Sequence, residues 1–146
     1  MTDQKNQRGA ALLELAFVIP ILLVITFIVT EFGRAIYQYS ALTKSVRDAA
    51  RYLSIQTPNT KVTEAQNLVV YGTTTAGSTP LVTGLTTAMV SANWPIAPTG
   101  TNPPIYTVTV QISGYTFQST VLSAFGLPFS NVTFSNIRAT MRSHTT

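Results

Sequence analysis

The sequence contains one carboxylate in a place where ionised groups are rarely found. Glu14 lies near the start of a long apolar run that also contains Pro20, and a short basic stretch with Lys5 and Arg8 precedes it. An ionised side chain at the centre of a bilayer costs roughly 2.5–3.5 kcal/mol even on the mildest insertion scales. The carboxylate therefore needs a partner, unless its side chain simply extends toward the lipid headgroups.

The other polar residues offer little for catalysis. From Ala65 to Ile137 the chain contains no Asp, Glu, Lys, Arg or His, and it contains no cysteine at any position. General acid–base catalysis needs a titratable side chain near the substrate, and a Ser or Tyr nucleophile needs a neighbouring group that activates it. We therefore expect a protein that is not an enzyme and that has no cofactor and no metal site.

The basic character of the chain does not indicate nucleic-acid binding. The net charge is +4 and the calculated pI is about 9.7. However, five of the nine Lys and Arg residues precede residue 48, where they flank the apolar segment. A nucleic-acid interface would gather them on one surface of a folded domain, so we expect no nucleic-acid partner.

The apolar pattern predicts a helix with two different halves. Residues 10–30 are predicted to span a membrane, because about 20 residues at 1.5 Å per residue give about 30 Å. A secretory signal would be shorter and would end in a small-residue cleavage site, whereas here the helical pattern continues. Over residues 31–55 the apolar side chains recur on one face of an amphipathic extension, which is predicted to pack against a sheet. This predicted packing face consists of Phe32, Ile36, Tyr39, Leu42, Val46 and Leu53.

Pro20 is predicted to kink the membrane half of this helix. No proline occurs between Pro20 and Pro58, so we expect one helix of about 45 residues, roughly 65 Å long. Pro20 removes one backbone hydrogen bond from it. Two interpretations remain open: a proline that the membrane helix merely tolerates, or a flexible point that lets subunits bend as they leave the bilayer.

Residues 56–146 are predicted to form a small α/β head domain outside the cytoplasm. A two-turn helix should end at Gly72, after a cap and first turn at Thr63 and Glu64. Trp94 and the segment 115–117 are predicted core. The predicted strands are Leu85–Asn93, Ile105–Ser113 and Val132–Met141, with a register shift near Asn136, and a helical turn is predicted at Thr120–Phe125. Three short strands cannot bury both faces alone. The predicted fold is therefore α+β: one long N-terminal helix packed by a small antiparallel sheet.

Four segments carry a resemblance to a known family. They are Arg8-Gly-Ala-Ala-Leu-Leu-Glu14, Val18-Ile-Pro20, Glu31-Phe-Gly-Arg-Ala-Ile-Tyr37 and Val46-Arg-Asp-Ala-Ala-Arg-Tyr52. With these segments the chain resembles the TadE-like pseudopilins of the bacterial tight-adherence (Tad/Flp) pilus systems, a branch of the type IV filament machinery. The resemblance is dense over residues 8–54 and thinner beyond them.

The resemblance implies a type IV pilin-like fold and a precursor that is processed and then assembled. Residues 1–9 would be a leader peptide that a prepilin peptidase removes by cutting after Gly9, so that Ala10 becomes the first mature residue. Glu14, the fifth mature residue, would meet the amine of a neighbouring subunit. The implied partners are other pilin-like subunits, the peptidase, the assembly platform of the bacterial inner membrane, and the membrane itself.

The role within such a system is left open by the sequence. The major Flp subunit is typically much shorter and has Tyr after the motif Glu, whereas Leu15 and a whole domain follow here. This difference favours a minor pilin or pseudopilin that helps to assemble an adhesive pilus. The alternatives are the main repeating subunit of a type IV-like filament and a membrane-anchored binding module outside the cytoplasm that never polymerises.

Overall fold

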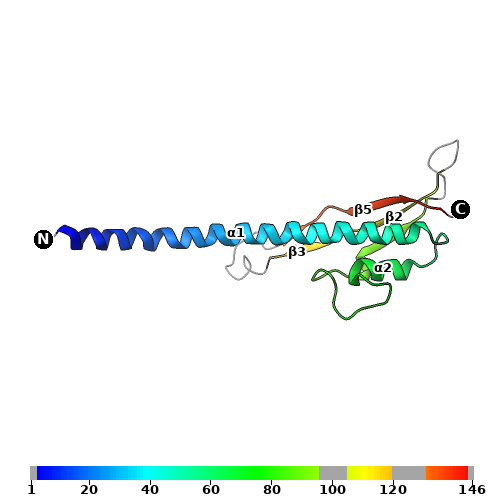
Figure 1. Ribbon diagram of the computed structural model, residues 1–146, viewed down its shortest axis with the longest axis horizontal. Helices are drawn as coiled ribbons and strands as arrows, with labels where there is room; N and C mark the ends of the chain where they lie inside the picture. The colour runs from blue at the N-terminus through cyan, green and yellow to red at the C-terminus, as the bar shows by residue number, and fades with distance from the viewer. Residues whose placement is uncertain (1–2, 96–104, 120–130, 145–146) are drawn as a thin grey trace. The chain divides into compact units, whose positions relative to one another are not determined.

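The structure, a computed structural model, describes residues 3–95, 105–119 and 131–144, with side chains from Gly9 onward. The elements in chain order are α1 (Asp3–Ser54), α2 (Val62–Tyr71), the 3₁₀ helix η1 (Thr87–Met89), β1 (Val90–Asn93), β2 (Thr107–Ile112), β3 (Thr116–Gln118), β4 (Asn131–Thr133) and β5 (Ile137–Arg142) (Figure 1). The chain divides into two compact units. The first contains α1 as far as Ala35, and the second begins at Ile36 and contains the rest of α1 with α2 and all the strands.

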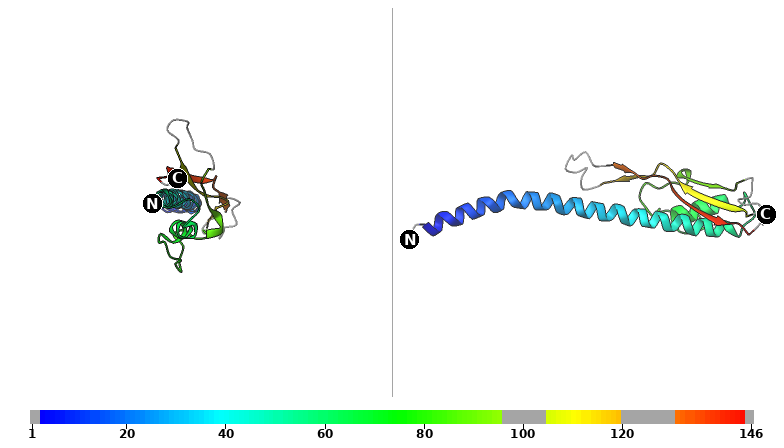
Figure 2. Two further views of the ribbon diagram at one scale, coloured as in Figure 1. Left: turned by 90° about the vertical axis from the view of Figure 1, so that its right-hand side faces the viewer. Right: turned by 90° about the horizontal axis from the view of Figure 1, so that it is seen from above.

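Helix α1 is a single helix of 52 residues, longer than predicted because it already begins at Asp3. It continues through Pro20. In the right-hand view of Figure 2 the blue part of α1, which contains this proline, is visibly curved. A curved helix is the usual consequence of a proline in a helix interior, where one backbone hydrogen bond is missing.

In the second unit, α1 from Ile36 to Ser54 is covered by a sheet and by α2. The sheet has the order β1-β2-β5 and is antiparallel throughout, with Val110 of the central strand opposite Ala92 and Ala139. The left-hand view of Figure 2, which looks along the helix, shows the strands and α2 on different sides of α1. Alternate residues of β2 are buried, as expected for a strand with one face on a core. This arrangement confirms the predicted α+β, pilin-like fold.

Helix α2 ends where the sequence predicts but begins earlier. Its last residue is followed by Gly72, whose φ of 76° is left-handed and whose N–H donates to the carbonyl of Leu68. The N-cap is Lys61, also left-handed at φ 58°, and it makes no side-chain cap bond. The prediction of a cap at Thr63 is therefore wrong by two residues, since the left-handed turn starts the helix without a hydroxyl cap.

Two predicted strands are shorter than the sequence indicates. The predicted strand Leu85–Asn93 is extended only over β1, because η1 occupies residues 87–89 in front of it. The predicted strand Val132–Met141 is two strands: β4 pairs with β3 in a separate two-stranded sheet, and β5 pairs with β2. The predicted strand Ile105–Ser113 corresponds to β2 and is confirmed.

An aromatic cluster lies at the break between β4 and β5. Phe134 donates its N–H to the carbonyl of Tyr115 at 3.0 Å, and its ring lies 5.6 Å from that of Tyr115 and 6.4 Å from that of Phe117. The chain leaves one sheet to place this ring and then joins the other, so the predicted register shift near Asn136 is a change of sheet. Tyr115, Phe117 and Trp94 are buried, which confirms them as core. The helical turn predicted at Thr120–Phe125 lies outside the described residues.

Candidate functional site

The first part of α1 exposes apolar side chains on all its sides. Between Leu12 and Val29 the exposed large apolar side chains range from 41% exposed for Val18 to 71% for Phe17. Within the described residues, one helix is long and apolar enough to cross a membrane, with a mean hydropathy of 2.8 over its most apolar window. Apolar surface of this extent calls for lipid or an apolar partner.

Glu14 lies on this apolar surface without a partner. Its side chain is exposed, and in the part of the chain that the structure describes it makes no hydrogen bond and no ion pair. Gly9 and Ala10 are exposed on the same helix. Glu14 lies five residues after Gly9, which is about 7.5 Å along the axis. The carboxylate thus stands near the predicted cleavage point, available to a group from another molecule.

Unlike the carboxylate of Glu14, the threonine hydroxyls of the same helix have hydrogen-bond partners within it. Thr26 donates to the carbonyl of Leu22, and Thr30 donates to the carbonyl of Thr26, each at 2.8 Å. A hydroxyl bonded back to the helix in this way can enter hydrocarbon without an unsatisfied polar group. Glu14, in contrast, has no such bond within the described residues and still needs a partner.

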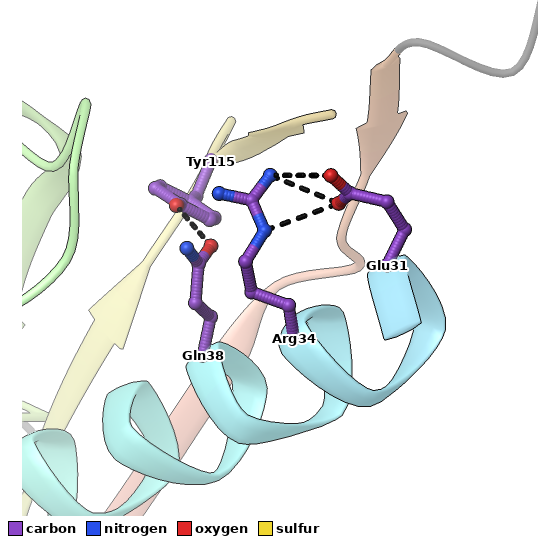
Figure 3. Close-up of polar contacts among 4 residues, drawn as sticks. All are labelled: Glu31, Arg34, Gln38 and Tyr115. Carbon is purple, nitrogen blue, oxygen red and sulfur yellow. Dashed lines mark hydrogen bonds and ion pairs between the residues drawn. The ribbon is translucent and has the colours of Figure 1, made fainter. Parts of the chain in front are cut away.

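A second carboxylate, at the end of the apolar run, is neutralised within the helix. Glu31 is only 3% exposed and accepts from Arg34 in a bidentate arrangement, with Nε to Oε2 at 3.1 Å and Nη2 to Oε1 and Oε2 at 3.2 and 2.9 Å (Figure 3). A bidentate guanidinium–carboxylate pair is among the stronger side-chain contacts, because two N–H groups are donated in a fixed geometry. The sequence analysis missed this pair, although an acid and a base three residues apart were visible in it.

In the second unit a hydroxyl connects the aromatic cluster to α1. The hydroxyl of Tyr115 lies 3.0 Å from Oε1 of Gln38 and 3.0 Å from the carbonyl of Thr83, so these two acceptors share its proton. Tyr115 itself is 2% exposed. A buried tyrosine generally needs a partner for its hydroxyl, and Gln38 supplies one from the helix.

The predicted packing face of α1 is buried over only part of its length. Leu42, Val46 and Leu53 are at most 1% exposed, and their neighbours Ala49 and Ala50 are fully buried. These small residues allow other elements of the second unit to approach the helix closely.

The first three residues of the predicted face remain largely exposed. Phe32 is 68% exposed, Ile36 52% and Tyr39 44%, although the Tyr39 ring meets the edge of the Phe134 ring at 5.5 Å. The prediction that these three residues are buried is therefore wrong. Apolar periodicity shows which side chains avoid water, but it does not distinguish a core within the chain from a surface offered to another molecule.

A polar clamp fixes the turn between α1 and α2. Glu64 accepts from the hydroxyl of Tyr52 and from Nζ of Lys61, the latter at 2.5 Å. The bond from Lys61, followed by that from Tyr52, lowers the pKa of Glu64. The same carboxylate raises the pKa of Tyr52 and that of Lys61, in both cases chiefly through the hydrogen bond. The clamp holds the helix connection and suggests no chemistry.

None of the residues described above forms a recognisable catalytic centre. Within the described ranges, no group of three His, Cys, Asp or Glu side chains is placed to hold a metal ion. The distinctive features are an exposed apolar helix with one unpartnered carboxylate and a small sheet domain on the later part of that helix. This combination defines the class of pilin-like proteins.

The comparisons with known proteins agree with this class. A family model described as TadE-like protein matches residues 9–51. Over this segment the chain is similar to TadE-like proteins, as the sequence resemblance implied. No curated protein and no solved structure matches the chain.

Proposed function

We propose that the chain is a pilin-like structural subunit, a minor pilin or pseudopilin, that acts in assembling a Tad-type adhesive pilus. The observation that carries this proposal is Glu14, exposed and without a partner on an apolar helix, five residues after Gly9. A helix that needed only to anchor a domain would gain nothing from a carboxylate at this depth. The work of the protein is then assembly and involves no catalysis.

The first step is removal of the leader, residues 1–9. A prepilin peptidase cuts after Gly9 and leaves Ala10 with a free amine at the start of the helix. Before cleavage that nitrogen belongs to a neutral peptide bond, so it carries no charge. Cleavage thus creates the positive group that Glu14 lacks.

The second step is docking between subunits. When two helices lie side by side in the membrane, the ammonium of Ala10 on one subunit pairs with the carboxylate of Glu14 on the next. In a medium of low dielectric constant the attraction is large, and leaving either charge alone is costly. The pair therefore favours one register of the two helices, while the apolar side chains around it keep water out.

The proposed location follows from the same helix. Residues 10–30 lie in the bacterial inner membrane, and residues 31–55 with the head domain 56–146 lie outside the cytoplasm. Glu31 and Arg34, paired with each other, mark the end of the apolar stretch and reach the membrane surface as a neutral unit. The curvature in the part of α1 that contains Pro20 gives the membrane half a point at which to bend on entering the pilus.

The proposal is tested first by mass spectrometry of the mature N-terminus in cells with an active prepilin peptidase. We expect a protein that begins at Ala10. Glu14→Gln keeps the size and most of the polarity of the side chain but removes its charge. This variant should be inserted and cleaved normally, yet fail to crosslink to partner subunits, so that surface pili decrease.

Two controls make the experiment decisive. Glu14→Leu should insert even more readily and assemble as poorly, because the missing group is the charge and not the polarity. Lys5→Gln changes a charge in the leader, which assembly does not use, and should leave the pili intact. A mature chain that begins at Met1, or normal crosslinking of both Glu14 variants, would contradict the proposal.

A further inference from the structure

The net charge of the chain resides entirely in its second unit. Residues 36–146 contain six Lys and Arg against two Asp and Glu, a net charge of +4, whereas residues 1–35 contain three of each and are neutral. Lys61 and Glu64 neutralise each other in the clamp. The uncompensated charges are therefore on α1 and on β5.

Three of these basic residues form a stripe along α1. Lys44, Arg47 and Arg51 lie within an arc of about 60° at 100° per residue, roughly opposite the buried positions of the helix. All three are exposed, and among the described residues none of them forms an ion pair. We call these residues the basic stripe. Asp48, one step to the side, is the single acidic residue beside it.

The same uncovered side of α1 carries apolar surface directly before the stripe. Tyr37 is 76% exposed and Ile36 is 52% exposed. Tyr37 and Lys44 also line a groove of about 580 Å³, together with Asp48, Leu68 and Leu81. Aromatic and apolar side chains next to arginine, beside a groove, are the usual composition of a protein-binding surface.

We propose that this side of α1, from Ile36 to Arg51, is the docking surface for a different pilin-like subunit whose facing surface is acidic. This inference rests on the proposed function and names the neighbour in the assembly. The apolar residues supply contact area, and the basic stripe selects the partner by charge complementarity.

A second copy of this chain fits the surface poorly. Two copies that met through this surface would each bring the basic stripe to the contact, and like charges placed face to face are unfavourable. An acidic subunit would be attracted to the basic stripe, whereas a second copy of this chain would be repelled by it. The charge distribution thus favours a mixed assembly over a filament of identical subunits.

A lipid surface is disfavoured by the spacing along α1. Lys44 lies fourteen residues beyond the proposed end of the membrane span, which is roughly 21 Å of helix. The screening length at physiological salt is about 8 Å, so anionic headgroups would be screened from all three residues of the stripe.

The test is photocrosslinking in cells that produce the complete pilus system. A benzophenone amino acid replaces Ser40, which is exposed between Tyr37 and Lys44, and the adduct is identified by mass spectrometry. We expect a different pilin-like protein. The double variant Arg47→Glu, Arg51→Glu should reduce this adduct at least about tenfold, because attraction becomes repulsion.

The matched control makes the same charge change on β5. The variant Arg138→Glu, Arg142→Glu should retain the adduct, since both arginines are exposed on another element. The milder variant Arg47→Gln, Arg51→Gln should give an intermediate loss, and an unchanged melting temperature shows that each variant is folded. Replacing an acidic residue at the crosslinked site of the partner by Lys should restore the adduct of the Glu variant.

The inference is overturned if the adduct is a dimer of this chain, if it is a lipid, or if charge reversal leaves it unchanged. The mature N-terminus and the Glu14→Gln phenotype are measured in the same cells. If both behave as proposed while the adduct is a homodimer, the docking surface is wrong and the pilin function stands. If neither does, the proposed function fails.

Discussion

The two halves of α1 have the same backbone and meet different surroundings. From Gly9 to Val29 the helix is apolar on all sides, its hydroxyls are bonded back to its own carbonyls, and one carboxylate lacks a partner. From Leu42 to Ser54 one face is fully buried within the second unit, while the opposite face carries the basic stripe. The apolar side chains of the first half are exposed, whereas the second half buries one face within its own unit.

The segment between the two halves contains the transition from the apolar run to the half with a buried face. Glu31 and Arg34 neutralise each other at the end of the apolar run. Phe32, Ile36 and Tyr37 follow, apolar and exposed, before the first fully buried position. A contiguous exposed apolar patch generally marks a contact with another molecule. If the proposed function holds, the intermolecular surface of α1 includes these residues as well as the membrane half.

The largest effect is expected where the second half is buried. Leu42→Asp places a charge in a site that is 1% exposed, with no described group positioned to pair with it, and should cost about 3–5 kcal/mol of unfolding free energy. The measurement is thermal unfolding of the full chain in detergent, followed by loss of sheet signal. Tyr37→Asp, on a residue that is 76% exposed, is the control and should change the melting temperature little. If both variants had the same melting curve, the conclusion that Leu42 lies on a buried face of α1 and Tyr37 on an exposed face would be wrong.

A smaller effect is expected at the end of the apolar run. Arg34→Ala leaves the buried carboxylate of Glu31 without its bidentate donor and should cost about 1–3 kcal/mol. Arg34→Lys keeps the charge but gives up the planar two-point contact, so its cost should be lower. The check is local amide exchange around residues 31–38. If Ala and Lys give the same exchange rates, the bidentate geometry has no energetic role.

Stability should be less sensitive to a substitution at Gly72, at the end of α2. Gly72→Ala forces a Cβ onto a left-handed residue and brings it to 3.3 Å from Cδ2 of Leu81. We expect a loss of about 1 kcal/mol, measured by denaturant unfolding. Gly33→Ala is the matched control in α1, because nothing lies within 4 Å of its added Cβ, and this change should be neutral or slightly stabilising.

The elements of the fold could be predicted wherever the local pattern of apolar residues or a turn residue alone determines them. The long helix, the central strand β2 and the end of α2 at Gly72 each follow from local pattern and are present. The split between β4 and β5 could not be predicted, because Phe134 stays opposite Tyr115 and its ring contacts rings that lie far from it in sequence. Local alternation of side chains contains no information on such contacts.

The sequence predicts the key residue of the candidate site, but it does not predict how far the exposed surface extends along α1. Glu14 stands out from sequence alone, since a carboxylate in an apolar run is rare. The boundary of the packing face was not predictable, because Phe32 and Leu42 are equally apolar and only the structure shows which one the second unit covers. The basic stripe was missed for a related reason: charges counted along the chain do not reveal that three of them share one uncovered side of a helix.

The smallest expected effect is a pH dependence of the clamp, which distinguishes the carboxylate of Glu64 from that of Glu14. Because the pKa of Glu64 is lowered in the folded chain, its contribution to stability is present above the ordinary value of 4.5 and is lost as the pH falls through the lower folded value. The raised pKa of Lys61 acts in the opposite direction: its contribution is present below 10.5 and is lost as the pH rises through the higher folded value. The melting temperature of wild type should therefore exceed that of Glu64→Gln over a plateau between these limits, and the two should converge toward acid. Glu14→Gln, which touches no described group of the second unit, should melt like wild type at every pH. A Glu64→Gln difference that persists below the acid limit would show that the clamp acts through packing and not through charge.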